Sequence, residues 1–400
     1  MKSRAEELEE WVTDVIFGNA HGFRAWCMRC VLRVCSWFFL LVVTLRRYLF
    51  RRRIKAVHYL GTFVVSVGNI TAGGTGKTPV VELLSRSLAA RGRRCAILTR
   101  GYKSKPLRKP QRWLDKDGRR VRAVPKIASD GTTRYLGPLN AGDEPFMLAR
   151  NLDGVAVLVD KDRVKSGIFA IEQLGSNTLI LDDGMQYLKL RHELDIVLVD
   201  CGFPFGAGRG ALLPRGTMRE PRRALRRASY IILTKSGGKP QHELIATIRK
   251  YNPVADIIVT NHAPAYLENI FTRERRPLSF LEGKYVACLS GIARPESFEC
   301  LVEGQGARVE IRRRYPDHYW FDQADLEAFV QRCADRALDA IITTEKDAVR
   351  FLKPEEMDVP IYFLRIEIDI LEGREKWDRM IDRICAISAP APAPEWGDVL

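Results

Sequence analysis

The sequence predicts an α/β protein, with a parallel sheet flanked by helices, a second, smaller α/β domain and an N-terminal membrane-associated helix. Three observations support this fold class. Short apolar runs rich in β-branched residues alternate with helical periodicity from residue 56 onward, a pattern typical of a parallel sheet covered on both faces. One run ends in a glycine-rich loop that leads into an amphipathic helix. A strongly apolar segment flanked by arginines precedes all of these runs.

The N-terminal segment, residues 1–55, is expected to associate with a membrane surface. Nine basic and no acidic residues lie between Arg24 and Lys55, and they enclose the apolar stretch Val34–Leu45. Twelve helical residues span about 18 Å, which is short for a hydrocarbon core of about 30 Å. On a helix, the polar side chains form one stripe: Arg29, Arg33, Ser36, Thr44, Arg47 and Arg51. This pattern favours a helix lying among the headgroups of an anionic leaflet; a short span with snorkelling arginines and a core or oligomer helix are the alternatives.

Residues 56–260 are expected to form a nucleotide-binding domain, followed by a C-terminal α/β domain over 261–385 and a disordered, Ala/Pro-rich tail over 386–400. Helical periodicity lies between several of the runs, as in 80–90 and 162–174. The strands expected in the first domain are 63–68, 95–99, 155–160, 178–183, 195–200 and 230–234. A second set follows at 256–260, 285–290, 339–344 and 361–365.

The composition is that of a globular protein with surplus positive charge. Apolar residues make up 46% and charged residues 28% of the 400 positions, which excludes a disordered or collagen-like chain. The N-terminus is charged and acidic, unlike a secretory signal. We therefore expect the protein to be cytosolic and its nine cysteines to be reduced thiols. The net charge of +15 indicates an anionic partner: nucleic acid, a membrane surface or a phosphorylated substrate.

The glycine-rich loop carries the strongest local signal. The segment 63–88 reads FVVSVGNITAGGTGKTPVVELLSRSL, a strand, a loop and a helix in the order that phosphate binding requires. Gly73, Gly74 and Gly76 allow backbone N–H groups to approach phosphate oxygens at a helix N-terminus. Lys77 can reach the β- and γ-phosphates, and the Thr78 hydroxyl can ligate Mg²⁺. The motif departs from GxxxxGK[ST] because Thr71 stands where the first glycine is usual.

The predicted ATP-binding residues are Asn69, Thr71, Ala72, Gly73, Gly74, Thr75, Gly76, Lys77 and Thr78. In proteins with such a phosphate-binding loop, an acidic residue is expected at the end of a neighbouring apolar strand. The segment TLILDDGMQ places Asp182 and Asp183 at that position. Carboxylates beside a phosphate loop hold Mg²⁺ directly or through water. Asp160 and Asp200 also end strands and are weaker candidates.

Several motifs occur together in one order: SVGNITAGGTGKTPVV (66–81), LTRGY (98–102), AGDEP (141–145), LDDGMQ (181–186), LLPRGTMREP (212–221), SGIARPESF (290–298), PDHYWF (316–321) and TTEKDAV (343–349). In this combination the sequence resembles the tetraacyldisaccharide 4'-kinases of lipid A biosynthesis. The resemblance implies a P-loop kinase-like fold with the active site between two α/β domains. It also implies transfer of the γ-phosphoryl group of ATP to the 4'-hydroxyl of an acylated glucosamine disaccharide phosphate.

The resemblance also assigns roles to residues. It implies that Asp143 and His318 pair to activate the acceptor hydroxyl, which suits a histidine oriented by a carboxylate. It assigns the metal to Asp182 and Asp183, with Gln186 nearby, and places Arg219 and Glu220 in the same site. Arg219 would stabilise charge on the transferred phosphoryl group, and Glu220 is a further candidate metal ligand. Arg100 and Tyr102 are assigned loosely to acceptor contacts.

The resemblance implies a location at the cytoplasmic face of the bacterial inner membrane, as a peripheral or monotopic protein. We expect no nucleic-acid partner, because no recognition motif with base-stacking aromatics is present, and no obligate protein partner is evident. Two alternative functions stay open at this point. One is a regulatory P-loop NTPase acting on a protein partner, and the other is a nucleic-acid-binding ATPase.

Overall fold

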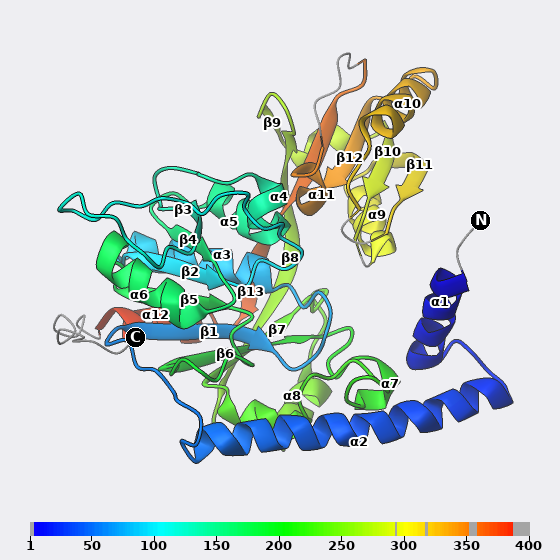
Figure 1. Cartoon of the computed structure of the whole chain (residues 1–400). Helices are drawn as coiled ribbons and strands as arrows, with labels where there is room; N and C mark the ends of the chain where they lie inside the picture. Colours follow the sequence, from blue (N-terminus) through cyan, green and yellow to red (C-terminus); the bar gives the residue numbers. More distant parts are fainter. Residues whose placement is uncertain (1–3, 293, 317–318, 352–357, 387–400) are drawn as a thin grey trace.

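The protein is described here by a computed structural model that covers residues 4–292, 294–316, 319–351 and 358–386. Its core is one mixed sheet of thirteen strands in the described part of the chain, covered by helices (Figure 1). The strand order is β11-β10-β12-β13-β8-β7-β6-β1-β5-β2-β4-β3, and β9 pairs with β8 beside this path. The α/β fold class and the N-terminal helix predicted from the sequence are confirmed.

The first part of the sheet is parallel except at its edge. β1 (Phe63–Asn69) lies in its centre, between β5 (Thr178–Asp182) and β6 (Leu194–Asp200), and every residue of β1 is buried. The remaining strands are β2 (Cys95–Thr99), β3 (Lys126–Ser129), β4 (Ala156–Val159) and β7 (Tyr230–Thr234), of which β3 runs antiparallel. The carboxyl ends of β1 and β5 therefore meet at one edge, the usual place for ligand binding in open α/β sheets.

The second part of the sheet is joined to the first by two long strands. β8 (Asp256–Asn269) pairs with β7 at its start and then antiparallel with β13 (Ile361–Glu372). β13 also pairs with β12 (Ala340–Thr344), which continues the sheet through β10 (Tyr285–Ser290) to β11 (Arg308–Arg314); β9 is Arg275–Arg276. Residue 260, near which the domain boundary is expected, falls inside β8. Figure 1 shows β8 and β13 running from the larger body into the upper lobe.

Helices cover the sheet in both parts. The first part carries α3 (Lys77–Ala90), α4 (Pro138–Ala141), α5 (Asp143–Asn151), α6 (Arg163–Leu174), α7 (Ala207–Gly210), η1 (Arg222–Arg227) and α8 (His242–Arg249). The second part carries η2 (Leu278–Leu281), α9 (Pro295–Glu303), α10 (Gln323–Ala334) and α11 (Glu345–Ala348). α12 (Arg374–Ala386) lies in the range expected for the C-terminal domain, yet its buried face packs in the core around β1 and α3.

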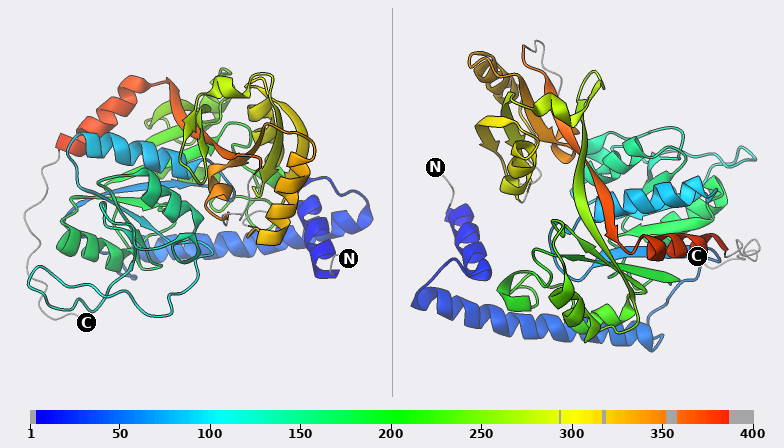
Figure 2. Two further views of the ribbon diagram at one scale, coloured as in Figure 1. Left: turned by 90° about the horizontal axis from the view of Figure 1, so that it is seen from above. Right: turned by 180° about the vertical axis from the view of Figure 1, so that it is seen from behind.

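The N-terminal residues form α1 (Arg4–Phe17) and α2 (Phe23–Arg51). α2 runs along the outside of the body in Figure 1 and in the right-hand view of Figure 2. It is 29 residues long, so it extends well beyond the apolar stretch Val34–Leu45, and its length and composition would allow a membrane span. Its buried residues are Ala25, Ser36 and Phe50, whereas Trp37 and Phe38 are 62% and 67% exposed.

The face of α2 toward the body contains part of the stripe that the sequence suggested for lipid headgroups. The Ser36 hydroxyl lies 2.9 Å from the carbonyl oxygen of Leu212 and accepts a hydrogen bond from the Arg215 N–H at 3.0 Å. Arg47 of the stripe lies 4.0 Å from the Glu220 carboxylate, and Arg46, which is next to the stripe, donates to the carbonyl of Gln186 at 3.0 Å. Helical periodicity defines such a stripe, but only the fold shows what it faces. Here Ser36 and Arg47 of the stripe contact protein, whereas Arg33, Thr44 and Arg51 are exposed, as are apolar residues such as Trp37 and Phe38.

Candidate active site

The glycine-rich loop connects β1 to α3 at the carboxyl edge of the central strand. Gly76 precedes the first helical residue, Lys77, with φ of 79°, and Gly73 has φ of 112°. These left-handed conformations suit glycine because a Cβ would be strained there. The first turn of α3 leaves backbone N–H groups without intrahelical partners, which is the anion-binding end of a helix. The loop therefore has the strand–loop–helix geometry that the sequence predicts.

Polar contacts from β1, β7 and the residue after β7 hold this loop in place. Asn69 donates from Nδ2 to the Thr75 hydroxyl at 3.0 Å, and the Thr234 hydroxyl donates to the Thr75 carbonyl at 2.9 Å. Lys235 donates to the Gly74 carbonyl at 2.5 Å and pairs with Asp200 at 2.9 Å. Asp200, a weaker candidate for the metal, thus holds the lysine that supports the loop.

His262 of β8 lies directly against Gly76, a contact that the sequence gave no sign of. A Cβ on Gly76 would lie 2.6 Å from Nε2 of this histidine. Burial, and then the nearby charge of Lys235, lower the pKa of His262 to about 4, although Asp200 opposes the shift. The ring is therefore neutral at physiological pH, and it fixes the space available under the loop.

Three charged side chains meet at the start of α3. Asp183 lies 3.4 Å from Nζ of Lys77, and its two oxygens each accept a hydrogen bond from Nη1 of Arg219 at 2.8 Å. Burial raises the pKa of Asp183, but Lys77 and Arg219 outweigh it, so that the pKa is lowered. The structure thus brings together three of the residues expected to handle the phosphates and the metal.

Asp182 is the last residue of β5 and precedes Asp183, but its pKa is shifted in the opposite direction. Its Oδ2 accepts a hydrogen bond from the Thr99 hydroxyl at 3.0 Å, whereas its buried Oδ1 has no partner. Burial, followed by the charges of Glu144 and Asp183, raises the pKa of Asp182 to about 7. A buried carboxylate oxygen without a partner, next to a second carboxylate, suits a hard cation such as Mg²⁺. The donor set therefore fits the expected ion, with the Thr78 hydroxyl in the first turn of α3 as a further oxygen.

Glu220 is engaged differently. Its carboxylate accepts hydrogen bonds from Arg227 at 2.7 and 2.8 Å and from Gln186 Nε2 at 3.0 Å. Gln186 also donates to the Asn69 carbonyl at 3.0 Å, which ties Glu220 to the end of β1. As a metal ligand, Glu220 would have to exchange some of these partners, so its metal role stays a prediction. In this structure Glu220 fixes the GTMREP loop against the phosphate loop.

Asp143 is the first residue of α5 and is buried. Its Oδ2 lies 2.8 Å from Nη2 of Arg350, a fully buried side chain of the second part of the chain. Arg350 also donates from Nη1 to the Tyr319 carbonyl at 3.1 Å and to Asp347 at 3.2 Å. Asp347 in turn accepts a hydrogen bond from the Gly291 N–H at 2.9 Å.

These contacts join four of the sequence motifs, AGDEP, SGIARP, PDHYWF and TTEKDAV, around one guanidinium group. His318, predicted to pair with Asp143, lies outside the described residues. Arg350 was missed because it follows TTEKDAV by one position and carries no motif signal of its own. Its spacing of three residues from Asp347, one helical turn, was the available hint.

The TTEKD segment also anchors α3. Glu345 accepts a hydrogen bond at 2.7 Å from Nη1 of Arg365, which contacts Glu82 of α3 through Nη2. Asn151 of α5 donates to Glu345 at 2.7 Å. The segment therefore connects β12 and β13 to two helices of the first part and stabilises the junction between the two parts of the sheet.

Arg100 and Tyr102, loosely assigned to the acceptor, flank a tight contact between RGY and AGD. A Cβ on Gly101 would lie 3.2 Å from the Ala141 carbonyl oxygen, and one on Gly142 would lie 3.2 Å from that of Tyr102. Tyr102 is 67% exposed beside the Asp143 helix. An acceptor role for both residues stays a prediction.

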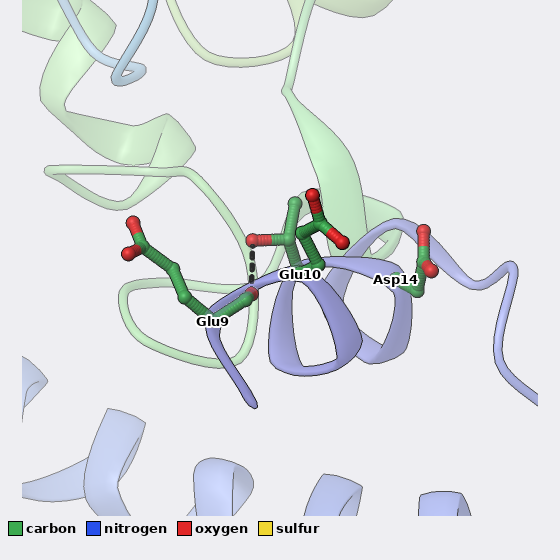
Figure 3. Close-up of a pocket in the computed structure, with 4 residues that line it drawn as sticks. Glu9, Glu10 and Asp14 are labelled. Atoms are coloured by element: carbon green, nitrogen blue, oxygen red, sulfur yellow. Dashed lines mark hydrogen bonds between the residues drawn. The ribbon is translucent and has the colours of Figure 1, made fainter. Parts of the chain in front are cut away.

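A separate pocket of about 470 Å³ lies along α1 and shares no residue with this site. It is lined by Glu9, Glu10, Thr13 and Asp14, and the Thr13 hydroxyl donates to the Glu9 carbonyl (Figure 3). Acidic side chains would repel nucleotide phosphates, so the pocket does not compete with the phosphate loop as an ATP site.

Comparisons with known proteins agree with the geometry. Residues 28–386 match the family described as Tetraacyldisaccharide-1-P 4'-kinase. The Tetraacyldisaccharide 4'-kinase of Anaeromyxobacter sp. (strain K) is 40% identical over 357 residues, covering 88% of this chain and 89% of that protein. The enzyme of the same name from Syntrophus aciditrophicus is 37% identical over 353 residues, covering 85% and 89%.

Among solved structures, the chain is similar to LpxK from Aquifex aeolicus in complex with ATP. The TM-score is 0.69 at 27% identity, covering 89% of this chain and 99% of that one. These similarities favour a kinase over the regulatory NTPase that the phosphate loop alone left open.

Proposed function

Because this chain belongs to the tetraacyldisaccharide-1-P 4'-kinase family, we propose that its site transfers the γ-phosphoryl group of ATP to the 4'-hydroxyl of an acylated glucosamine disaccharide phosphate. The chain is a kinase of lipid A biosynthesis. The observation that carries the site assignment is the contact of Lys77, Asp183 and Arg219 at the start of α3. This is where the terminal phosphates of a nucleotide lie in a phosphate-loop protein.

Different residues of the chain would bind the phosphates of ATP and stabilise the charge on the transferred group. The phosphate loop and the N-terminus of α3 bind the phosphates of ATP, and Lys77 places its charge beside the β- and γ-phosphates. Arg219, held in a fixed direction by Asp183, offers its remaining N–H groups to the charge on the transferred group. Binding of ATP would loosen the pairing of Lys77 with Asp183, since the phosphates are stronger partners for the lysine.

The metal site of this proposal consists of Asp182 and Asp183, with the Thr78 hydroxyl. A bound Mg²⁺ would neutralise charge on the β- and γ-phosphates. The unpartnered Oδ1 of Asp182 is the oxygen best prepared for it. Asp182 would need to be ionised to bind a cation, and its raised pKa of about 7 makes that step sensitive to pH near neutrality.

Asp143 and His318 would act on the acceptor hydroxyl. In this proposal the imidazole takes the proton as the acceptor oxygen attacks the γ-phosphorus and the bond to the ADP oxygen breaks. The Asp143 carboxylate orients the imidazolium and stabilises its charge. The ion pair with Arg350 supports the proposal because a neighbouring positive charge favours the ionised carboxylate. Arg350 would therefore act as a positioning residue for Asp143.

We propose further that α2 lies in the surface of an anionic leaflet and does not span it. The helix is held against the body through Ser36, Arg46 and Arg47, which contact the Leu212 carbonyl, the Gln186 carbonyl and the Glu220 carboxylate, so that its axis follows the surface of the body. Its opposite face exposes Trp37, Phe38, Leu41 and other apolar side chains. Such a helix would keep the body at headgroup depth, where a lipid acceptor presents its sugars.

The test of this function is direct. The purified full-length chain is incubated with γ-labelled ATP, Mg²⁺ and a tetraacyldisaccharide 1-phosphate in mixed micelles, and the lipid product is isolated. We expect label on the 4'-oxygen of the disaccharide, and we expect Lys77→Ala to abolish it while circular dichroism stays unchanged. Label released only as inorganic phosphate, or near-normal kcat in Lys77→Ala, would refute the assignment.

A further inference from the structure

Arg365 of β13 lies where the two parts of the sheet join. β12 and β13 are paired as far as Thr344 and Leu364, so Glu345 and Arg365 are the residues that follow this last pair. α3 of the first part and α11 of the second part both lie against β13 and against α5. Figure 1 shows α11 at the place where the upper lobe meets the larger body.

The guanidinium group of Arg365 binds two carboxylates that come from different parts of the chain. Its Nη1 donates to Oε2 of Glu345 at 2.7 Å, and its Nη2 donates to Oε1 of Glu82 on α3. All three residues are buried. Two buried carboxylates that share one guanidinium group would repel each other without it. Arg365 is therefore the cation that holds α3 and α11 together.

The last residue of α5 joins the same set of contacts. Nδ2 of Asn151 donates to Glu345 at 2.7 Å and to Glu82 at 3.3 Å. Arg86, one helical turn after Glu82, donates to the Glu82 carboxylate at 2.7 Å and to the Asn151 carbonyl at 2.8 Å. Three helices thus meet at one polar network, which we call the Arg365 junction: Glu82, Arg86, Asn151, Glu345 and Arg365.

Each of the three helices leads from this junction to a residue of the proposed reaction. α3 begins at Lys77, five residues before its junction residue, and α5 begins at Asp143, eight residues before its own. Arg350 follows α11 directly in the chain after one residue, and its guanidinium group binds Asp143. Helices as short as these keep their length because each turn is hydrogen-bonded to the next. The junction therefore sets the spacing between the phosphate-binding end of α3 and the Asp143 carboxylate.

We propose that Arg365 is a positioning residue for phosphoryl transfer, because it fixes the distance between the γ-phosphate held at Lys77 and the acceptor hydroxyl activated at Asp143. This inference rests on the proposed function, since it assumes transfer from ATP to a hydroxyl at Asp143. Arg365 acts only through Glu82 and Glu345. A displacement of reacting groups by about 1 Å can lower a rate about 10²-fold, so loss of Arg365 should slow transfer and leave ATP binding intact.

The experiment compares variants of the full-length chain: Arg365→Gln, Arg365→Lys, the double variant Glu82→Gln/Arg365→Gln, and the matched control Arg150→Gln. Arg150 of α5 also forms an ion pair across the two parts, with Glu268 of β8 at 3.2 Å, and the two side chains are 8% and 9% exposed. Steady-state kinetics of lipid phosphorylation are measured across pH. Calorimetry gives Kd for a non-hydrolysable ATP analogue with Mg²⁺, and urea denaturation gives the unfolding midpoint of each protein.

We expect Arg365→Gln to lower kcat about 10- to 100-fold, with unchanged KM for ATP, unchanged Kd for the analogue and unchanged pH limbs. Arg365→Lys, which keeps the charge but not the fork, should lose less. In the double variant the urea midpoint should return toward that of wild type, because one uncompensated buried carboxylate is gone, while kcat stays low. Arg150→Gln should lower the midpoint and keep the wild-type kcat.

A purely structural role for Arg365 gives different results. Recovery of kcat together with the midpoint in the double variant would overturn the proposal, as would an equal loss of kcat in Arg150→Gln or a wild-type kcat in folded Arg365→Gln. If Arg365→Gln does not fold, Arg365→Lys and the double variant decide the same comparison. Failure of wild type to phosphorylate the lipid would refute the proposed function, and this inference with it.

Discussion

Nη2 of Arg350 lies 2.8 Å from Oδ2 of Asp143, across 207 positions of sequence and between the two parts of the sheet. Both side chains are buried, and the guanidinium group is also bound to Asp347 and to the Tyr319 carbonyl. One residue of the second part thus sets the position of the carboxylate that we expect to act on the acceptor.

Two substitutions of Arg350 should distinguish the effect of its positive charge from the effect of the position in which it holds Asp143. Arg350→Lys keeps a positive charge but loses the fork that also binds Asp347, so we expect kcat to fall about 10- to 100-fold with KM for ATP unchanged. Arg350→Met removes the charge, and the acidic limb of the kcat/KM profile should then move to higher pH. Wild-type pH limbs in a folded Arg350→Met would contradict the positioning role. Unfolding midpoints in urea check that each variant is folded.

Gly76 is a second position where the structure makes a sharp prediction. Gly76→Ala places a Cβ at φ of 79° and 2.6 Å from Nε2 of His262, so the loop must shift. We expect a weaker ATP affinity by calorimetry, with partial recovery in Gly76→Ala/His262→Ala, because the second change removes the clash but not the backbone strain. Gly74→Ala is the matched control, since a Cβ there meets nothing within 4 Å. Equal losses at the two glycines would argue against the contact.

Asp182 should make stability depend on pH in the absence of Mg²⁺ and ATP. Its folded pKa of about 7 lies above its ordinary value of 3.8, so the folded state binds the proton more tightly than the unfolded state. Its contribution to the unfolding free energy is complete below about pH 4 and is lost as pH rises through 7, at up to about 1.4 kcal/mol per pH unit.

Urea denaturation of wild type and Asp182→Asn at several pH values measures this difference. The excess slope of wild type over the variant should appear between about pH 4 and 7 and should shrink when Mg²⁺ is added, because the cation favours the ionised form. Parallel pH curves for the two proteins would show that Asp182 does not titrate in this window.

The orientation of α2 can be tested with two labels on one helix face. Cys30 and Tyr48 are both exposed and 18 residues apart, five helical turns or about 27 Å along the axis. Spin labels at Cys30 and at Tyr48→Cys report depth in anionic vesicles. The other accessible cysteines are replaced by serine: Cys27, Cys35, Cys201, Cys300 and Cys385. A helix lying in the surface gives equal depths, whereas a spanning helix separates them by almost the thickness of the hydrocarbon core.

The fold was predictable where the signal is local. Every strand expected from a continuous apolar run is present, because strands buried on both faces must be apolar throughout. β3, β9 and β11 were missed. β9 has only two residues, and β3 and β11 are edge strands, which need no such run; RVEIRRR in β11 keeps only Val309 and Ile311 as apolar residues. The expected domain ranges stay a prediction, although β8 and β13 carry one sheet across the boundary.

The candidate site was predictable in its phosphate-binding half alone. Loop, lysine and strand-end acids are adjacent in sequence or in strand order, so pattern and spacing identify them. Arg350 and His262 act through contacts that only the tertiary fold creates, and neither belongs to a motif. The polar stripe of α2 was recognised from helical periodicity, but periodicity does not reveal whether a stripe faces water, lipid or protein.

A double-mutant cycle on kcat tests whether Asp143 and His318 act as one unit on the acceptor. Asp143→Asn, His318→Ala and the double variant are compared in phosphoryl transfer to the lipid acceptor at saturating ATP. We predict single losses of about 10²- to 10⁴-fold, unchanged KM for ATP, and a double variant little worse than the poorer single one. Fully multiplicative losses would instead show that the two residues have independent roles.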